Sequence, residues 1–401
     1  ALGADTAANL DLTGFASARL GAIGTATLSG SITPHGATYR LGGGGGTLVL
    51  SNTNALTGNR ALDIDSGGTT PGTVRLAASN NFAGNISVTG GQALEAGSSA
   101  ALGNPANSLL LDGGTFRFVA GSPFDLFAER TVTFGPGGAT LNTNGNSYVV
   151  TVAISGNGGT GTFRKGGDGM LVLGLPGTYT GATRIEGGAI GFNQAGQFGS
   201  TSGIILGDGT LRYHGSDTTG LGKTVDISSG TGSAAIEVVD AEGTLILDHL
   251  VSGTDAVHKV GDGTLIFANR PNTFTGGIFV DDGVLAVPGI GAAQYNEFGP
   301  AGTNKTITIS NGATFRVLSA NFNPAASPNR KALAVGVGGA EFNIPAGAIL
   351  QLDDAGQFLG TDVLTKTGRG LLDLRAAFTG FTGSIDVTEG SLDIRNAQAA
   401  G

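Results

Sequence analysis

The stretch that decides the fold reads Lys165-Gly166-Gly167-Asp168-Gly169-Met170-Leu171-Val172-Leu173, followed at residues 178–185 by Thr-Tyr-Thr-Gly-Ala-Thr-Arg-Ile. The second and fourth residues after Gly169 are apolar, which is the pattern of a strand with one buried face. A second strand pattern follows Gly181, and turn-forming residues lie between the two strands. Because this phrase recurs along the chain, it indicates a repeat architecture.

Five copies of the phrase are marked by two glycines twelve or thirteen residues apart. The first glycines are Gly46, Gly72, Gly169, Gly263 and Gly370, and the second are Gly58, Gly84, Gly181, Gly276 and Gly383. We expect the apolar residues after each first glycine to face inward, namely Leu48 and Leu50, Val74 and Leu76, Leu171 and Leu173, Leu265 and Phe267, and Leu372 and Leu374. Four second glycines lead into another strand, at Ile86 and Val88, Thr183 and Ile185, Ile278 and Val280, and Ile385 and Val387.

Longer phrases recur at a higher-order spacing of 94 residues from Gly169 to Gly263 and 107 from Gly263 to Gly370. One such phrase begins with a basic residue, at Arg130-Thr131-Val132, Lys223-Thr224-Val225 and Lys331-Ala332-Leu333. A β-helix coil takes about 20 to 25 residues, so each module holds several coils. We predict a single continuous β-helix over residues 1–401, with modules at approximately 1–45 (partial), 46–168, 169–262, 263–369 and 370–401 (partial).

These patterns predict an all-β fold, a right-handed parallel β-helix (β-solenoid) with glycine-rich turns. Short strands between glycine-rich turns are also compatible with an antiparallel sandwich or barrel. The parallel solenoid is favoured because equivalent strands recur at equivalent positions and can stack directly on one another. No helical period is present, so crossover helices for an α/β sheet are lacking.

The phrase closely resembles the passenger repeat of bacterial autotransporters, the autotransporter-associated β-strand repeat. The lysine four residues before the first glycine belongs to this resemblance and is present as Lys165, Lys259 and Lys366, but Gly42 and Gly68 replace it in the two N-terminal copies. The resemblance implies a right-handed parallel β-helix displayed outside a Gram-negative-type cell. It says little about activity, because such repeats occur in surface proteins of many roles. The membrane barrel that typically ends these proteins is not found before Gly401, so we expect a cut passenger or a self-assembling fibre.

Composition excludes several function classes. The 401 residues include 74 glycines and no cysteine, and 40% are hydrophobic and 13% charged. A net charge of −9 argues against nucleic-acid binding, which requires clustered Lys and Arg. The absence of cysteine removes disulfides and thiolate metal sites.

No apolar run long enough to span a membrane is present. Because the chain starts at Ala1 without a signal core, we expect a mature product from which a signal peptide was removed.

Three local motifs resemble functional sites, and each is better explained as part of a coil. Ile64-Asp65-Ser66-Gly67-Gly68 is similar to the nucleophile run of trypsin-like proteases, but only His35 precedes it and we expect a turn. Lys223-Thr224, after Asp217, approaches a phosphate-binding loop without its leading glycine. Gly167-Asp168-Gly169 and Gly261-Asp262-Gly263 resemble calcium-binding turns, but Leu171 and Leu265 stand where a further aspartate is needed. A weak surface ion at these turns remains open.

Acidic and aromatic residues give two further alternatives. Acidic groups cluster at Asp240, Glu242 and Asp248, at Asp281-Asp282 and at Asp353-Asp354. Paired carboxylates could cleave polysaccharides, but solvated turn acids are the favoured interpretation. The four histidines, His35, His214, His249 and His258, show no metal spacing. The aromatic set Phe82, Tyr179, Phe274 and Phe381 could stack on sugars, although burial inside the solenoid explains it without a ligand.

We therefore predict a non-enzymatic extracellular β-solenoid, a surface-displayed passenger or self-assembling fibre subunit used in adhesion or matrix formation. No catalytic, cofactor-binding or metal-ligating residue is expected, and no cofactor. The expected partners are further copies of the chain, joined head to tail through uncapped solenoid ends, and a host or matrix surface ligand; nucleic acid and a transmembrane segment are not expected. One alternative is a carbohydrate-binding or polysaccharide-cleaving β-helix, recognised by three carboxylates of neighbouring coils in one groove. The other is the stalk of a larger protein.

Overall fold

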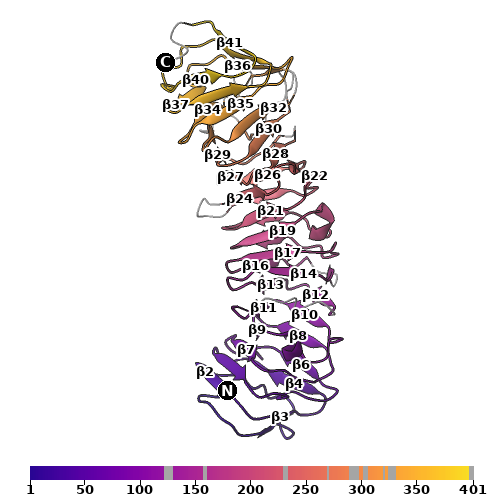
Figure 1. The fold of residues 1–401 in the computed structure, drawn as a ribbon. Coiled ribbons are helices and arrows are strands. Elements are labelled where there is room, and N and C mark those ends of the chain that lie inside the picture. The colour runs from indigo at the N-terminus through magenta and orange to yellow at the C-terminus, as the bar shows by residue number, and fades with distance from the viewer. Residues whose placement is uncertain are drawn as a thin grey trace. The chain divides into compact units, whose positions relative to one another are not determined.

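The computed structural model describes residues 1–121, 130–156, 160–228, 234–268, 271–288, 298–300, 306–318, 321–323 and 331–396. Contacts divide the chain into two compact units, residues 1–191 with 196–202, and residues 192–195 with 203–401. In each unit short strands stack coil on coil in parallel ladders, which confirms the predicted all-β solenoid (Figure 1). The right-handed sense of the coil and a single continuous domain over residues 1–401 stay predictions.

The first unit contains short strands and two single-turn 3-10 helices, η1 (Ser99–Leu102) and η2 (Ala195–Phe198), the second of which starts at the division between the units. Its strands are β1 (Leu10–Asp11), β2 (Thr25–Leu28), β3 (Ile32–Thr33), β4 (Thr38–Leu41), β5 (Thr47–Leu50), β6 (Ala61–Ile64), β7 (Thr73–Leu76), β8 (Ile86–Thr89), β9 (Ala93–Ala96), β10 (Leu109–Asp112), β11 (Gly114–Phe118), β12 (Val132–Phe134), β13 (Ala139–Asn142), β14 (Tyr148–Val150), β15 (Ile154–Gly156), β16 (Phe163–Gly166), β17 (Met170–Leu173), β18 (Thr183–Ile185) and β19 (Ala189–Phe192). Strand orders are β1-β3, β15-β12-β10-β8-β6-β4, β2-β5-β7-β9-β11-β13-β16-β18 and β14-β17-β19.

The second unit has the same architecture, and its described strands belong to four sheets. Its strands are β20 (Ile204–Leu206), β21 (Thr210–Tyr213), β22 (Thr218–Gly220), β23 (Val225–Ile227), β24 (Ala235–Val238), β25 (Thr244–Leu247), β26 (Val251–Gly253), β27 (Val257–Val260), β28 (Thr264–Phe267), β29 (Ile278–Val280), β30 (Val284–Val287), β31 (Thr306–Ile309), β32 (Thr314–Val317), β33 (Asn321–Phe322), β34 (Ala332–Val335), β35 (Ala340–Asn343), β36 (Ile349–Leu352), β37 (Phe358–Gly360), β38 (Leu364–Thr367), β39 (Leu371–Leu374), β40 (Ile385–Val387) and β41 (Ser391–Ile394). Strand orders are β20-β23-β26, β21-β24-β27-β29-β31-β34-β37, β22-β25-β28-β30-β32-β35-β38-β40 and β33-β36-β39-β41.

The core is made of columns in which each coil contributes one inward side chain. In one column Leu48 pairs with Val74, Val74 with Leu94 and Leu94 with Phe116, and all four are 1% exposed or less. The inward residues predicted after all five first glycines are 2% exposed or less, so that prediction is confirmed. Burial of these aliphatic and aromatic side chains is the main favourable term for folding.

The last described coil is less buried than the coils before it. Val387 of β40 is aligned with buried Lys366 of the coil before it, yet Val387 is 43% exposed. Strands β40 and β41 are the last strands that the structure describes in their sheets, so their inward faces are covered from one side only. Burial of this strand therefore depends on a coil on each side of it.

Nine of the ten glycines of the phrase lie where the backbones of adjacent coils touch, and Gly58 is the exception. A Cβ atom added at Gly169 would collide with the carbonyl oxygen of Asn146, and one added at Gly276 would collide with that of Asp255. The same collision with a carbonyl oxygen of another coil occurs at Gly46, Gly72, Gly84, Gly181, Gly263, Gly370 and Gly383. Glycine is therefore required there by close packing of the main chain.

Candidate functional site

Three lysines occupy inward positions that elsewhere hold apolar side chains. Lys165 of β16 lies in register between Leu141 of β13 and Ile185 of β18. Lys259 of β27 and Lys366 of β38 occupy corresponding positions in the second unit, and all three are 0% exposed. A buried ammonium is costly unless it is hydrogen-bonded, so its partners determine what these lysines do.

Each ammonium is bound by three backbone carbonyls, which matches its three donors. Lys165 Nζ donates to the oxygens of Gly166, Gly167 and Gly187 at 3.1, 2.7 and 3.0 Å. The first two acceptors belong to the turn that follows the lysine, and the third to the equivalent turn of the next coil. The lysine thus ties two successive turns together.

The other two lysines repeat this geometry. Lys259 donates to Val260, Gly261 and Asp282 at 3.1, 2.5 and 3.0 Å, and Lys366 donates to Thr367, Gly368 and Glu389 at 2.8, 2.6 and 3.0 Å. Burial lowers the pKa of Lys165 to about 8, against the attraction of Asp168. Burial likewise lowers the pKa of Lys259 to about 8, against the attraction of Asp282, Asp262 and Glu237.

The N-terminal copies, which lack the lysine, fill the same part of the turn differently. Gln92 is fully buried, and its Oε1 accepts a hydrogen bond from the Gly72 amide at 3.2 Å. A Cβ atom at Gly42 would lie 2.6 Å from the Asp65 carbonyl oxygen and 3.0 Å from Gln92 Oε1. Gln92 therefore takes space that a side chain at residue 42 would need, and it connects coils that no lysine connects.

Arg130, the first residue of the recurring basic phrase, is a second cation inside the wall of the first unit. It is 2% exposed, and its Nη1 donates to the carbonyl oxygens of Asn104 and Asn107 at 2.7 and 3.3 Å. Its Nη2 donates to those of Ser99 and Gly103 at 2.9 and 3.1 Å. These acceptors lie at the start of η1 and in the loop that follows it, so the arginine holds this segment against the next coil.

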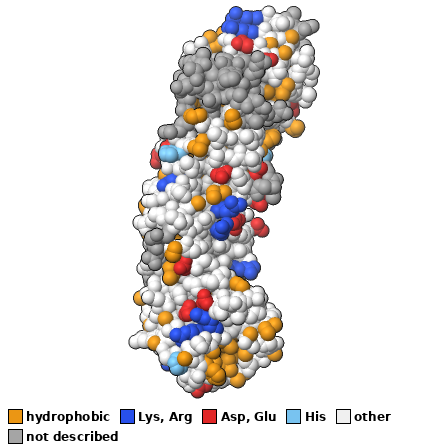
Figure 2. Space-filling model, turned by 180° about the vertical axis from the view of Figure 1, so that it is seen from behind, with side chains coloured by type: hydrophobic (Ala, Val, Ile, Leu, Met, Phe, Trp, Pro, Cys, Tyr) orange, Lys and Arg blue, Asp and Glu red, His pale blue; other side chains and the backbone are white. Residues whose placement is uncertain are grey.

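Charged side chains on the outer faces pair across neighbouring strands. Arg75 lies 3.5 Å from Glu95, Arg164 lies 2.6 Å from Glu186, and Arg212 lies 3.4 Å from Glu237. Figure 2 shows basic and acidic side chains side by side on the surface. Exposed pairs of this kind contribute little to stability, about 0–1 kcal/mol each.

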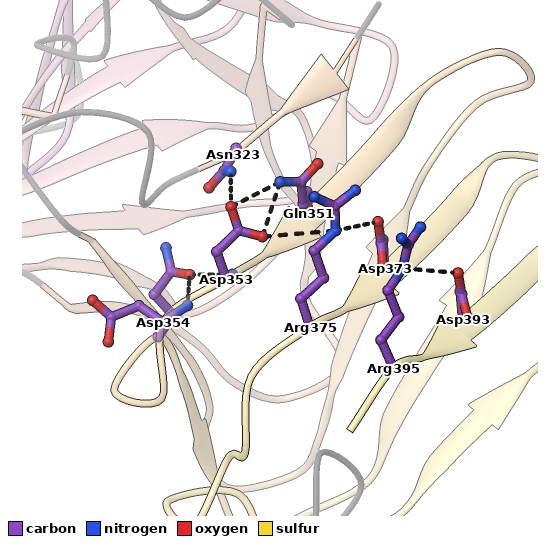
Figure 3. A network of polar contacts seen from close by, with 9 residues as sticks. Asn323, Gln351, Asp353, Asp354, Asp373, Arg375, Asp393 and Arg395 are labelled. Atoms are coloured by element: carbon purple, nitrogen blue, oxygen red, sulfur yellow. Dashed lines mark hydrogen bonds and ion pairs between the residues drawn. The ribbon is translucent and has the colours of Figure 1, made fainter. Parts of the chain in front are cut away.

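The outer face of β36, β39 and β41 carries a denser network, drawn in Figure 3. Asp353, Asp373 and Asp393 come from three successive coils, which is the arrangement the polysaccharide-cleaving alternative requires. Asp373 accepts hydrogen bonds from Arg375 Nε and Arg395 Nε at 2.7 and 2.9 Å. Each of the three carboxylates already accepts hydrogen bonds from arginine or amide side chains. Such bound carboxylates do not form the open acid and base pair that glycoside cleavage uses.

The structure places the three local motifs in turns or at strand starts. Ser66 lies in the turn between β6 and β7, where its carbonyl oxygen accepts a hydrogen bond from Thr69, and no hydrogen bond joins Ser66 to His35 in the described chain. Lys223 directly precedes Thr224 and β23, and burial lowers its pKa. Asp168 and Asp262 lie in the turns after β16 and β27, next to the buried Leu171 and Leu265. The structure therefore places each motif in the turn or at the strand start that the coil interpretation predicted.

The predicted acidic clusters are turn or surface residues. Asp240 Oδ1 accepts from the Glu242 amide at 2.9 Å, and Asp248 Oδ1 accepts from the Gly222 amide at 2.7 Å. Asp281 lies 2.7 Å from Nδ1 of His258, whose ring stacks on Phe279. Asp282 and Asp354 cap their own turns. In the described part of the chain, no three His, Asp or Glu side chains are grouped so that they could hold a metal ion.

The remaining histidines are unrelated to one another. His35 is exposed and contacts the Thr13 carbonyl, and His249 is exposed beside Asp248 at 3.2 Å. His214 is partly buried, and burial together with Arg212 lowers its pKa.

The four aromatic residues are buried, as the favoured interpretation requires, at 2% exposure or less. Three of them contact other rings: Phe381 stacks on Phe358 at 4.0 Å between centroids, Phe274 lies 5.8 Å from Phe267, and Tyr179 meets Phe163 edge-on at 5.6 Å. Successive members of the set are 97, 95 and 107 residues apart, whereas one coil takes between 19 residues (Leu171 to Ile190) and 30 (Leu285 to Phe315). The set is therefore a recurring core position rather than one unbroken stack.

Sequence reasoning missed the roles of three groups. The repeat lysines were recognised as part of the phrase, but their burial was missed, although the strand alternation places them on the inward face. Gln92 carries no repeat signal. The phrase Leu-Asp-x-Arg occurs twice, at residues 372–375 and 392–395, and this twenty-residue recurrence could have identified the Asp373 network.

Comparison with known proteins agrees with this geometry. The model of the passenger-associated-transport repeat matches residues 71–93, 163–190, 257–287 and 364–394. The chain thus contains four segments that match this passenger repeat. All three carbonyl-bound lysines lie inside matched segments, and the copy at Gly46 lies outside them.

The chain is also similar to a curated relative. An adhesin autotransporter of Brucella suis is 31% identical over 261 residues, which are 62% of this chain and 7% of the relative. The chain therefore spans a small part of that relative's length. No solved structure matches the chain significantly. The repeats and this similarity support a cell-surface or extracellular location. No helix in the described residues is long and apolar enough to cross a membrane.

Proposed function

We propose that this chain is a non-enzymatic scaffold segment of a surface passenger that takes part in adhesion. The observation that carries the proposal is the similarity to an adhesin autotransporter across 62% of the chain. The passenger-associated-transport repeats, whose lysines tie coil to coil, support it. In this proposal the passenger is exported and its signal peptide removed. The core and turns supply a stable frame, and the outer faces contact a host or matrix surface.

A display experiment tests adhesion directly. Residues 1–401 are presented on the surface of a non-adherent laboratory bacterium, and attachment to cultured epithelial cells and to extracellular-matrix-coated wells is counted. We expect several-fold more attachment than with an empty display anchor. A chain displayed at equal density that adds no attachment would mean that these residues serve as a stalk, with adhesive sequence elsewhere in the protein.

Head-to-tail self-association is the finer form of this proposal. The specific observation in its favour is the exposure of inward-type side chains in the last described coil, where Val387 and Ile394 are each 43% exposed. In a longer chain the same face would stack on a further coil. Negative-stain electron microscopy over a concentration series separates self-association from stacking on a further coil of the same chain. Self-association gives filaments that lengthen with concentration, and stacking within one chain does not.

A further inference from the structure

The outer face of the C-terminal sheet carries two arginines that are held in parallel. Gln351 of β36, Asp373 of β39 and Asp393 of β41 are in register, and Arg375 and Arg395 each follow two residues after an aspartate. With a side-chain period of two, aspartate and arginine of one strand share the outer face. Neighbouring strands lie about 4.8 Å apart, so the two arginines are one strand spacing from each other.

Asp373 is the residue that positions both arginines. Its side chain is 1% exposed, and its two oxygens are divided between them: Oδ2 accepts from Arg375 Nε at 2.7 Å and Oδ1 from Arg395 Nε at 2.9 Å (Figure 3). Asp393 adds a contact to Arg395 Nε at 3.1 Å. Both guanidinium groups are thus fixed by the same edge, on the side facing the protein.

The opposite edges of the two guanidinium groups are left for a ligand. Within the described residues, neither Arg375 nor Arg395 uses an Nη nitrogen in a hydrogen bond, and their side chains are 39% and 49% exposed. Arg164 differs, because its Nη1 is already bound to Glu186 at 2.6 Å. Free Nη pairs are the geometry with which arginine binds carboxylate, sulfate or phosphate groups.

We propose that Arg375 and Arg395 form a binding site for an acidic polysaccharide that carries sulfate or carboxylate groups. A pyranose unit advances a polysaccharide by a distance comparable to the strand spacing, so successive anionic groups can meet successive arginines. The inference rests on the proposed surface function, which places the chain where such polymers occur. The network of these two arginines with Asp353, Asp373 and Asp393 carries one net negative charge. Binding therefore depends on the paired Nη donors of each guanidinium group (its fork) rather than on overall charge attraction, and it weakens with salt.

The test measures binding of the purified chain to immobilised heparin, with unsulfated dextran as the reference surface. The double variant Arg375→Gln with Arg395→Gln is compared with Arg164→Gln plus Arg184→Gln, which changes the net charge by the same amount. Arg184 of β18 is in register with Arg164 of β16. We expect at least tenfold weaker heparin binding for the first and less than a twofold change for the second. Equal losses in both would overturn the proposal in favour of general charge attraction.

Two further variants separate geometry from charge. Arg375→Lys with Arg395→Lys keeps both charges and removes the forks, and we expect it to bind at least fivefold more weakly. Asp373→Asn makes the chain more positive, yet the proposal expects weaker binding because the arginines lose their anchor. Wild-type affinity in the lysine variant overturns the proposal, and so does tighter binding in Asp373→Asn. Thermal unfolding checks that each variant is folded.

The probes also distinguish the two proposals and the class of partner. Vesicles containing phosphatidylserine replace heparin in one arm, and arginine-dependent binding to them without binding to heparin would overturn the polysaccharide assignment. Heparin binding that depends on the two arginines, in a chain that gives no attachment when displayed, supports this site and contradicts only adhesion. Attachment of the displayed chain without heparin binding would support adhesion and contradict the polysaccharide site.

Discussion

The lysine-bearing turns and the N-terminal turns solve the same packing problem with different chemistry. Around Lys259 a charged group inside the wall donates to three carbonyls and joins two coils. Around Gly42 the charge is missing, and four successive glycines, Gly42 to Gly45, have φ values of 113, 83, 82 and 75°. The buried amide of Gln92 fills the space beside them. In these N-terminal turns glycine thus stands where the later turns have the lysine, and beside Gly42 a neutral buried side chain fills the space.

The largest effect is expected when a lysine is removed without that replacement. Lys259→Met keeps the length of the side chain but leaves the oxygens of Val260, Gly261 and Asp282 without their donor. Unsatisfied buried acceptors cost about 1–3 kcal/mol each, and part of this is returned because no ammonium is buried, so we expect a loss of about 2–3 kcal/mol. Chemical unfolding followed by circular dichroism measures it.

Arg369→Met is the matched control for this change. It removes the same charge from an exposed side chain in another turn of the second unit, and exposed substitutions alter stability by about 0.5 kcal/mol or less. If Lys259→Met were as mild as this control, the three hydrogen bonds would contribute nothing net. The lysine and glycine turns would then be equivalent.

The strand pattern predicted the fold because each inward residue repeats with period two beside a glycine that cannot carry a Cβ atom. Leu48 and Leu265 were placed correctly on that basis alone. The partners of Lys259 could not be placed, because its third acceptor, Asp282, lies 23 residues away and the pairing depends on the length of an irregular loop. Val387 lies in the predicted strand and in register with buried Lys366, yet it is exposed because burial in a solenoid requires coils on both sides.

A smaller effect is expected from pH, and it should occur only where the lysines are present. The folded pKa of Lys165 and of Lys259 is about 8, below the ordinary value of 10.5 that applies to the unfolded chain. Between these values the unfolded chain binds more protons than the folded one, so stability rises as pH increases from about 8 to 10.5 and is flat below. We expect the thermal midpoint to rise between pH 7.5 and 9.5. Lys259→Met should show a shallower rise, and Arg369→Met should keep the wild-type slope. A midpoint that falls over this range would contradict the burial of a charged lysine.

The smallest effect is expected in the N-terminal turns, at Gln92. Gln92→Leu retains the volume and removes the acceptor of the Gly72 amide. The Nε2 group of Gln92 is buried without a hydrogen-bond partner among the described residues, so only one hydrogen bond is lost. A single neutral hydrogen bond contributes about 1 kcal/mol, which is less than the loss expected for Lys259→Met. Hydrogen exchange of the Gly72 amide gives the local measure, and we expect it to accelerate while amides near Lys165 keep their protection. Unchanged protection at Gly72 would mean that Gln92 only fills space, and that the N-terminal coils are joined by their glycine-lined backbone contacts alone.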